Sequence, residues 1–253
     1  LMTTPDTPSP DRSFMEALAG AVLPLLQAMD ALAWARQRLD PYLIGQLGQA
    51  VRTFEAPLRA ALPAFQEADW PAGLTPFREG VEQAAAAVLE CYAELAPAAL
   101  AEPGFDALGL ARRAFRRHLA AERALYPLAA LSPPIGQYFL PDDAREDARV
   151  LERLDWAAAR EPAQGGVTAH PGPAGDRRGG YAFYVPEYLE SDTPAPVVLA
   201  LHGGRGNGPD FLWSWLPAAR ARGVVLIAPT AIGDTWALMG DDVDTPNLLR
   251  ILA

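Results

Sequence analysis

The sequence contains no lysine, and all 21 of its basic residues are arginine. This absence excludes a phosphate-binding loop of the form Gly-x-x-x-x-Gly-Lys-Ser/Thr, whose lysine contacts nucleotide phosphates. The 31 acidic residues outnumber the arginines and give a formal net charge of −10 at pH 7. We therefore expect no nucleic-acid partner, because neutralising a phosphate backbone requires a basic surface.

Cysteine and histidine are almost as scarce. Cys91 is the only cysteine, so no disulfide can form within the chain. Its apolar helical neighbours predict a small buried hydrophobic residue rather than a reactive thiol. Two of the three histidines, His118 and His170, are isolated, and no histidine pair has the spacing of metal ligands. We expect neither a metal nor a cofactor.

Long hydrophobic runs are also missing. The apolar, uncharged run from Ala17 to Met29 has 13 residues and is too short to span a bilayer. Residues 1–11, rich in Thr, Pro and Asp, are expected to form a disordered tail, and they lack the positive region that begins a secretory signal. The sequence thus predicts a cytoplasmic protein with no transmembrane segment.

Residues 12–160 are expected to form an all-α region. Apolar residues recur at steps of three and four in five segments, the first of which carries Phe14, Leu18 and Val22. Pro57 and Pro63 are expected to kink or divide the second segment. Such helices form a layer or bundle. Its role as a cap, a docking module or a homo-oligomer surface is left open by the sequence.

The pattern changes after residue 160. Residues 161–180 are rich in Gly, Pro and Ala and predict a linker or an edge hairpin. Apolar runs at 181–185, 197–201 and 224–228 predict strands, and a helix from Pro209 to Gly223 separates the last two. A strand–helix–strand order is typical of a parallel sheet covered by helices, so residues 181–253 indicate an α/β fold.

A glycine-rich loop follows the second of these strands. It reads Leu201-His202-Gly203-Gly204-Arg205-Gly206. Glycines let a substrate carbonyl approach bare backbone N–H groups, which can stabilise the oxyanion formed during ester hydrolysis. The alternative is a tight turn in another α/β protein such as a nucleotide-binding domain, although the Gly-x-Gly-x-x-Gly spacing is not present.

Residues 181 to about 240 resemble the start of the catalytic domain of α/β-hydrolases, in the phospholipase/carboxylesterase group and near the polyhydroxyalkanoate-depolymerase-like esterases. Four segments carry the resemblance: Tyr184-Val185-Pro186, Pro194-Ala195-Pro196, Leu201-His202-Gly203-Gly204 and Ala228-Pro229-Thr230. It implies a helical N-terminal region followed by the truncated start of an α/β-hydrolase parallel sheet.

The resemblance also implies roles for individual residues. The backbone N–H groups of Gly204 and Arg205 are expected to bind the oxyanion of a small-molecule or lipid ester, without a cofactor. His202, Gly203 and Gly206 are expected to shape the loop. Trp236 is a candidate substrate-pocket residue, with packing under a loop as the alternative.

The chain departs from this family in one important respect. The family's Ser, Asp and His triad follows the oxyanion loop, but Ser214 falls inside a helix without flanking glycines, and no other serine is suitably placed. In the family's sheet, the strand at 197–201 lies between the strand at 224–228 and the strand that carries the nucleophile. We therefore expect this chain to be an incomplete hydrolase domain that is inactive alone.

Two other hypotheses remain open at this point. The helical region could be the functional part, as an interaction or scaffold module beside a vestigial hydrolase segment. Alternatively, the α/β region could bind a nucleotide. Two charged clusters are interpreted as solvated surface rather than as sites. The first is a helical patch formed by Arg112, Arg113, Arg116 and Arg117, with Glu122 as an acidic neighbour. The second is a polar loop formed by Asp241, Asp242 and Asp244 before a helix that begins at Thr245.

Overall fold

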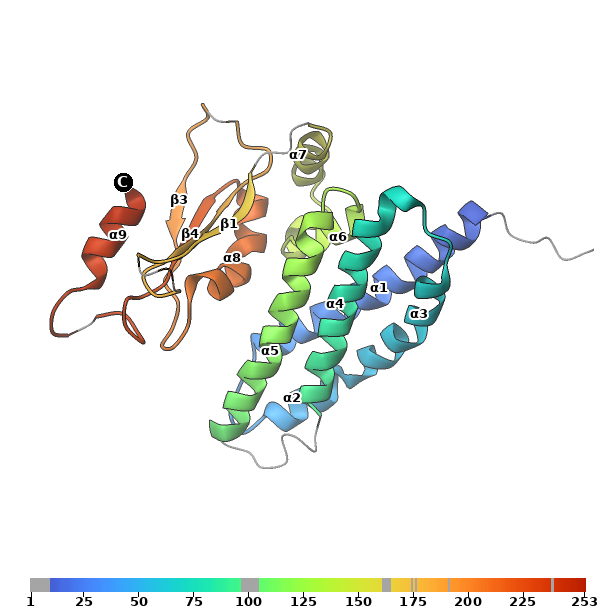
Figure 1. Ribbon diagram of the computed structural model, residues 1–253, viewed down its shortest axis with the longest axis horizontal. Helices are drawn as coiled ribbons and strands as arrows, with labels where there is room; N and C mark the ends of the chain where they lie inside the picture. Colours follow the sequence, from blue (N-terminus) through green and yellow to red (C-terminus); the bar gives the residue numbers. More distant parts are fainter. Residues whose placement is uncertain are drawn as a thin grey trace, which may run out of the picture. The chain divides into compact units, whose positions relative to one another are not determined.

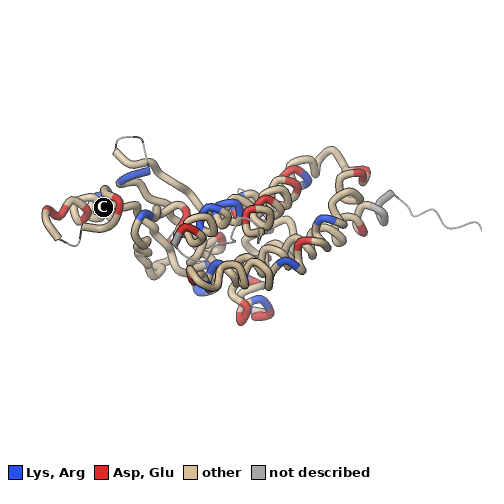
Figure 2. The backbone as a smooth tube through the Cα atoms, turned by 90° about the horizontal axis from the view of Figure 1, so that it is seen from below, with Lys and Arg blue, Asp and Glu red and all other residues tan. Residues whose placement is uncertain are grey.

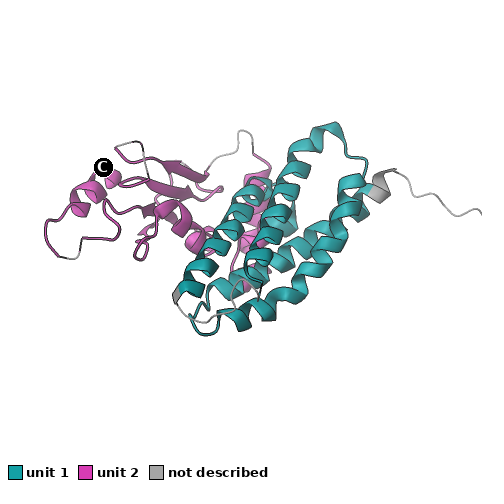
Figure 3. Ribbon diagram, turned by 60° about the horizontal axis from the view of Figure 1, so that its bottom comes forward, with its two compact units in different colours: residues 1–135 teal, residues 136–253 magenta. Residues whose placement is uncertain are grey.

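The computed structural model describes residues 10–96, 105–160, 165–173, 175, 177–190, 192–237 and 239–253. It is 61% helical, with a small mixed sheet of four strands after the helices, which is consistent with an α/β class. The chain divides into two compact units, residues 1–135 and 136–253 (Figure 3). Most of the predicted tail lies outside the described residues, and the first helix already begins at Pro10.

In its described part the first unit is built from helices (Figure 1). They are α1 (Pro10–Arg36), α2 (Ile44–Val51), α3 (Glu55–Glu67), α4 (Thr75–Glu94) and α5 (Phe105–Leu125), with 3₁₀ turns at Arg52–Phe54, Ala72–Leu74 and Tyr126–Leu128. Helix α4 packs along α5, and α1 packs along α3. The predicted amphipathic helices are therefore confirmed, with the second one divided in two.

Proline explains where that division falls. A proline inside a helix removes one N–H donor, and its ring clashes with the carbonyl four residues earlier. For Pro57 that carbonyl belongs to Thr53, which lies in the 3₁₀ turn, so α3 can begin at Glu55 with Pro57 in its first turn. Pro63 lies within α3 and does not end it.

The apolar stripes of these helices form the core of the first unit. The completely buried side chains in it include Leu25, Met29, Leu32, Leu58, Phe65, Val81, Val88 and Leu125. Cys91 lies among them, and burial raises the pKa of its thiol to about 12. The thiol therefore stays protonated at neutral pH and is unreactive, as the sequence predicted.

Helix α1 is more apolar over its length than the uncharged run had indicated. By length and composition alone, Phe14–Arg36 could cross a membrane, and 39% of its most apolar stretch is buried within the structure. Core helices of soluble bundles and N-terminal signal sequences share these properties.

Charge is mixed along these helices, as Figure 2 shows. In the arginine patch on α5, Arg117 forms ion pairs with Glu90 and Glu94 of α4, each at 3.1 Å. Glu122 differs from the prediction, because it is only 5% exposed and pairs with Arg36 of α1 at 3.4 Å. It therefore belongs to the buried part of the bundle rather than to a solvated face.

The second unit contains the sheet. After α6 (Pro133–Tyr138), a 3₁₀ turn (Asp142–Ala144) and α7 (Ala148–Ala158) come β1 (Gly166–His170), β2 (Tyr181–Val185), β3 (Val197–Leu199), α8 (Gly208–Arg222), β4 (Val225–Pro229) and α9 (Asp244–Leu252). The strand order is β1-β2-β4-β3. Helix α8 packs against β4 and β2.

The sheet is mixed, which corrects the prediction of a parallel sheet. Only β3 and β4 are parallel, whereas β2 runs antiparallel to both β1 and β4. Residues 166–170 form the first strand of an edge hairpin, with His170 paired to Tyr181 and stacked on its ring at 4.9 Å. An antiparallel hairpin needs only a short connection, so β1 and β2 do not require a crossover helix.

The units divide at residues 135/136, whereas the composition of the sequence changes at residue 161. The segment between these points belongs to the second unit because it packs there. Leu140, Ala144 and Val150 form an apolar cluster with Ala221 of α8. In addition, the buried Arg220 guanidinium donates to the Gly136 carbonyl at 2.6 Å.

Candidate functional site

The glycine loop and the segment after β4 lie at the same end of the sheet. Strands β3 and β4 are parallel neighbours, with Val197, Val198 and Leu199 opposite Val225, Leu226 and Ile227. Their carboxyl ends therefore lie at the same end of the sheet, which is where ligands bind in open α/β sheets. The loop at 202–207 leads from β3 into α8, and residues 230–243 lead from β4 into α9.

His202 connects these two segments and is only 3% exposed. The Ala231 N–H donates to its Nε2 at 3.1 Å, so Nε2 carries no proton. Its Nδ1, 2.7 Å from the Gly203 carbonyl oxygen, is then the protonated nitrogen and donates to it. Both ring nitrogens are therefore used within the fold, and His202 positions the loop instead of acting as a general base.

Further hydrogen bonds join the glycine loop to the segment after β4. The Arg205 N–H donates to the Asp234 carbonyl at 2.8 Å. The Trp236 indole N–H donates to the His202 carbonyl at 2.8 Å, and the two rings lie 5.0 Å apart. Arg178, which precedes β2, also holds the segment after β4, because it donates to the Gly233 carbonyl and, at 3.0 Å, to the Asp234 carboxylate. These bonds hold the two segments together as one rigid platform.

The platform leaves the Gly204 N–H available. Gly204 is exposed, and its N–H donates to none of the residues that the structure describes. The two residues that follow differ, because the Arg205 N–H is used as above and the Gly206 N–H donates to the Gly203 carbonyl at 3.1 Å. Of the two N–H groups expected to bind an oxyanion, Gly204 is free to do so and Arg205 is engaged.

The glycines around this position are required for different reasons. A Cβ on Gly206 would lie 3.0 Å from the Gly203 carbonyl oxygen, and one on Gly208 would lie 1.9 Å from that of Ala228. Neither Gly203 nor Gly204 has a positive φ. A Cβ on Gly203 would meet nothing within 4 Å, and one on Gly204 only the Thr235 hydroxyl at 3.9 Å. The fold itself therefore does not require glycine at 203 or 204. Glycine at these positions instead keeps the space beside the N–H groups open.

Arg205 carries the backbone strain of the loop. Its φ is +59°, and it is the one non-glycine residue with positive φ among those described. L-residues with side chains pay roughly 1–2 kcal/mol for this conformation. The bond from its N–H to Asp234 holds it there, and such strain concentrates at functional sites.

Asp244 stabilises the platform through hydrogen bonds to two backbone N–H groups, a role that the sequence analysis did not predict. It is only 5% exposed. Its carboxylate accepts the Ile232 N–H at 2.9 Å and the Ala237 N–H at 2.6 Å. The sequence predicted Asp244 to be part of a polar loop. Its bonds to residues 12 and 7 positions earlier in the chain could not be predicted from the residues beside it. Asp242 instead accepts the Thr245 N–H, which lowers the pKa of its carboxyl.

Asp244→Asn is therefore expected to lower the free energy of unfolding by about 1–2 kcal/mol, because only one amide oxygen remains to accept two N–H groups. Hydrogen exchange of the Ile232 and Ala237 amides should accelerate. The matched control is Asp241→Asn, since Asp241 is exposed and its side chain has no partner among the described residues. Equal effects of the two substitutions would contradict this role.

Trp236 and Ser214 complete the list of sequence candidates. Trp236 is half-buried and bonded to the loop backbone, so packing accounts for its position. Ser214 is exposed within α8 and is not part of the platform. No group of three potential metal-ligating side chains is found in the part of the chain that the structure describes. The described residues of the platform thus offer a hydrogen-bond donor for an anion, and they include no serine and no cluster of metal-ligating side chains.

The N-terminus of α8 is closed to a phosphate. The Gly208 N–H donates to the Thr230 hydroxyl at 2.9 Å, and the Asp210 N–H to the Asn207 side chain at 2.9 Å. Pro209 has no N–H, and the Phe211 N–H donates to the Asn207 carbonyl. The Asp210 carboxylate also lies at this end, where it would repel an anion. These contacts argue against the nucleotide-binding alternative.

Outside this site, His118 is the most unusual ionisable group. It is completely buried between α5 and α1, with Nε2 3.1 Å from the Met29 carbonyl oxygen and Nδ1 3.9 Å from Glu122. Burial, assisted by the positive charge of Arg36, lowers its pKa to about 3. The neutral ring is therefore part of the core of the bundle.

This shift predicts a pH-dependent stability. Above pH 6.5 His118 is neutral whether the chain is folded or unfolded. Between pH 6.5 and about 3, the unfolded chain binds a proton that the folded one does not. Protonation of His118 in the unfolded chain should then lower the free energy of unfolding by up to about 1.4 kcal/mol for each unit by which the pH decreases. Denaturant titrations at several pH values should show a shallower dependence for His118→Gln, and identical slopes would contradict the assignment.

No family model matches the chain, and comparison with curated proteins and with solved structures likewise finds no match. The function is therefore argued from the geometry of the site together with the resemblance of its motifs.

Proposed function

We propose that the second unit supplies the oxyanion-binding part of a serine hydrolase that acts on carboxylic esters. The Gly204 N–H is the donor. When a nucleophile adds to the ester carbonyl, its oxygen becomes negative, and a fixed N–H stabilises that charge by several kcal/mol at most. No cofactor is needed for this chemistry, and the substrate class is a small-molecule or lipid ester.

The single observation that carries the proposal is the unused, exposed N–H of Gly204. It lies on a loop at the carboxyl end of β3 that hydrogen bonds hold to the segment after β4. A preorganised donor is effective because it need not reorient during the reaction. The open space around Gly203 and Gly204 supports the same conclusion, since a reacting carbonyl must come within hydrogen-bond distance of the N–H.

The edge of the sheet at β3 gives further support. Pro196 and Ala200 bond to β4 through the Pro196 carbonyl and the Ala200 N–H. Strand groups alternate in direction, so the backbone groups of Val197 and Leu199 point to the other side. In the described residues no strand pairs there, and Val197 is 57% exposed. In the family that the sequence resembles, the nucleophile-bearing strand occupies this position.

The helical first unit has its own core and is the basis of the alternative function, an interaction or scaffold module. In the proposed hydrolase it would serve as a cap, a docking module or a homo-oligomer surface. Expression of residues 12–135 separates the alternatives, since a scaffold should fold cooperatively and retain its partner without the second unit.

The reading frame around codon 253 tests the hydrolase proposal. An in-frame Gly-x-Ser-x-Gly within roughly 20–40 codons downstream, after an apolar strand, supports it, and a frame without that motif contradicts it. A protein that includes the motif should hydrolyse p-nitrophenyl esters. There Gly204→Pro, which removes the N–H, should lower kcat/KM by about 100-fold, whereas Gly203→Ala should have little effect. Residues 1–253 alone should show no serine-dependent turnover.

A further inference from the structure

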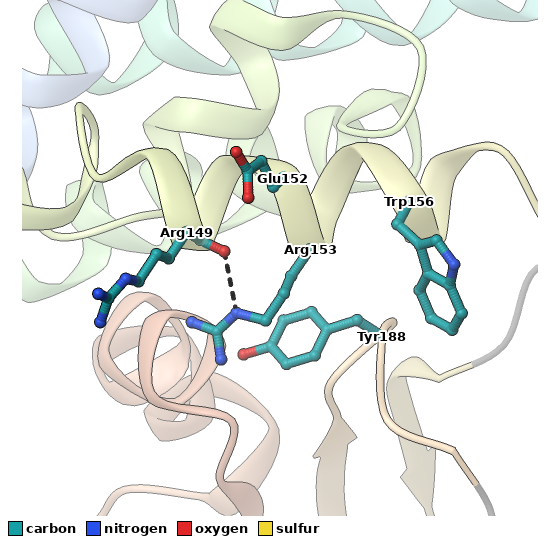
Figure 4. A pocket seen from close by; sticks show the side chains of 5 residues that line it. All are labelled: Arg149, Glu152, Arg153, Trp156 and Tyr188. Carbon is teal, nitrogen blue, oxygen red and sulfur yellow. Dashed lines mark hydrogen bonds between the residues drawn. The ribbon is translucent and has the colours of Figure 1, made fainter.

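A hollow lies within the second unit, between α7 and the segment that follows β2 (Figure 4). Its volume is about 730 Å³, and its lining residues are Arg149, Glu152, Arg153, Trp156 and Tyr188. Arg149, Arg153 and Trp156 follow one another at steps of four and three, so they share one face of α7 over a length of about 10 Å. In Figure 4 these three side chains lie on the Tyr188 side of α7, whereas Glu152 points away from it.

Arg153 is fixed at the centre of this hollow. Its Nε donates to the Arg149 carbonyl at 3.1 Å and a terminal nitrogen donates to the Ala221 carbonyl at 3.3 Å. Its guanidinium also stacks on the Tyr188 ring at 4.8 Å. A guanidinium has five N–H donors, and these bonds to backbone use two of them. In the described part of the chain, these remaining donors form no ion pair.

Arg149 adds a second positive charge at one end. It is exposed, and its guanidinium forms no ion pair with any residue in the described part of the chain. Residues four apart on a helix lie about 6 Å apart at Cβ, so both guanidinium groups can reach one carboxylate. Arg–carboxylate pairs are among the strongest hydrogen bonds that proteins form.

Aromatic surface lies beside these charges. The Tyr188 ring is held in place by its hydroxyl, which donates to the Arg220 carbonyl at 2.6 Å. At the other end of the face, Trp156 is 47% exposed, and Arg160 stacks on its ring at 4.4 Å. An exposed indole beside a fixed phenol ring offers a flat apolar surface next to two cations.

We propose that this hollow binds an aryl carboxylate, a ligand with one carboxylate joined to a flat aromatic ring system. The carboxylate binds Arg149 and the remaining donors of Arg153, and the ring system packs on Trp156 and Tyr188. The arrangement is independent of the Gly204 loop, so this site stands whether or not the chain is part of a hydrolase.

Calorimetric titration of the full chain with 2-naphthoate tests this assignment. Saturable binding is expected, and uncharged 2-naphthamide should bind about tenfold or more weakly, because it lacks the charge that the arginines recognise. Arg149→Gln should weaken naphthoate binding by about tenfold. Trp156→Leu should weaken naphthoate and naphthamide alike, since both use the ring surface.

Arg222→Gln is the matched control, because Arg222 is an exposed arginine of the same unit that does not line the hollow. It should leave the affinity unchanged. The positions substituted are exposed, so each variant should fold, which circular dichroism checks. The proposal is overturned if naphthoate does not bind, if the amide binds as tightly as the acid, or if Arg149→Gln and Arg222→Gln behave alike.

Discussion

Replacing Arg220 with methionine is expected to lower the free energy of unfolding of the second unit by about 3–5 kcal/mol. Arg220 is only 3% exposed and lies in the last turn of α8. Its guanidinium donates to Glu187 at 3.0 Å and to the Gly136 carbonyl at 2.6 Å. Its loss leaves a partly buried carboxylate without its cation and a buried carbonyl without its donor. Denaturant unfolding measured by circular dichroism gives the magnitude.

The control for this effect is Arg222→Met, two residues away on the same helix but exposed. It should change stability by less than about 0.5 kcal/mol. Adding Glu187→Gln to Arg220→Met should recover part of the loss, because the uncompensated charge is then removed. The assignment of Arg220 as the buried anchor fails if the two arginine substitutions cost the same.

Gly208→Ala is the second substitution with a large expected effect. A Cβ at this position would lie 1.9 Å from the carbonyl oxygen and 2.6 Å from the carbonyl carbon of Ala228. Both are backbone atoms of β4, so α8 must move away from the strand. This movement also breaks the bond from the Gly208 N–H to Thr230. We expect a loss of about 3 kcal/mol in the free energy of unfolding, seen as a lower midpoint of denaturation.

Gly204→Ala provides the comparison, since its nearest neighbour would be 3.9 Å away. It should leave the stability within about 0.5 kcal/mol of the original. If both substitutions were equally costly, glycine at 204 would serve the fold instead of the space beside the N–H.

Local patterns in the sequence predicted much of the second unit. Helix α8 has the expected end, because Gly223 adopts φ +70° and caps it after two arginines. Strand β4 begins at Val225 instead of Val224, since the Val224 N–H still bonds to the Ala219 carbonyl of the helix. The adjacency of β3 and β4, implied by the resemblance, is confirmed by their parallel register.

Other features depend on contacts between distant residues and could not be predicted. Strand β3, at the edge of the sheet, ends at Leu199 instead of Leu201, although the Ala200 N–H still bonds to the Ile227 carbonyl of β4. Arg220 lies in the last turn of a helix, a position typical of exposed cations, yet its partners lie 33 and 84 residues earlier in the chain. Likewise, Asp244 gives no sign in the sequence of the two amides that it binds. Burial of a charged side chain is decided by such pairings rather than by its own neighbours.

The central claim is that the glycine loop presents an unused backbone donor at Gly204, and amide hydrogen exchange measured by NMR on residues 1–253 tests it directly. The Gly204 amide should exchange at nearly the rate of an unstructured glycine. The Arg205 amide, bonded to Asp234, should exchange at least about tenfold more slowly than its own unstructured rate. Protection of Gly204 equal to that of Arg205 would mean that its N–H is already bonded, and the oxyanion-binding role would be contradicted.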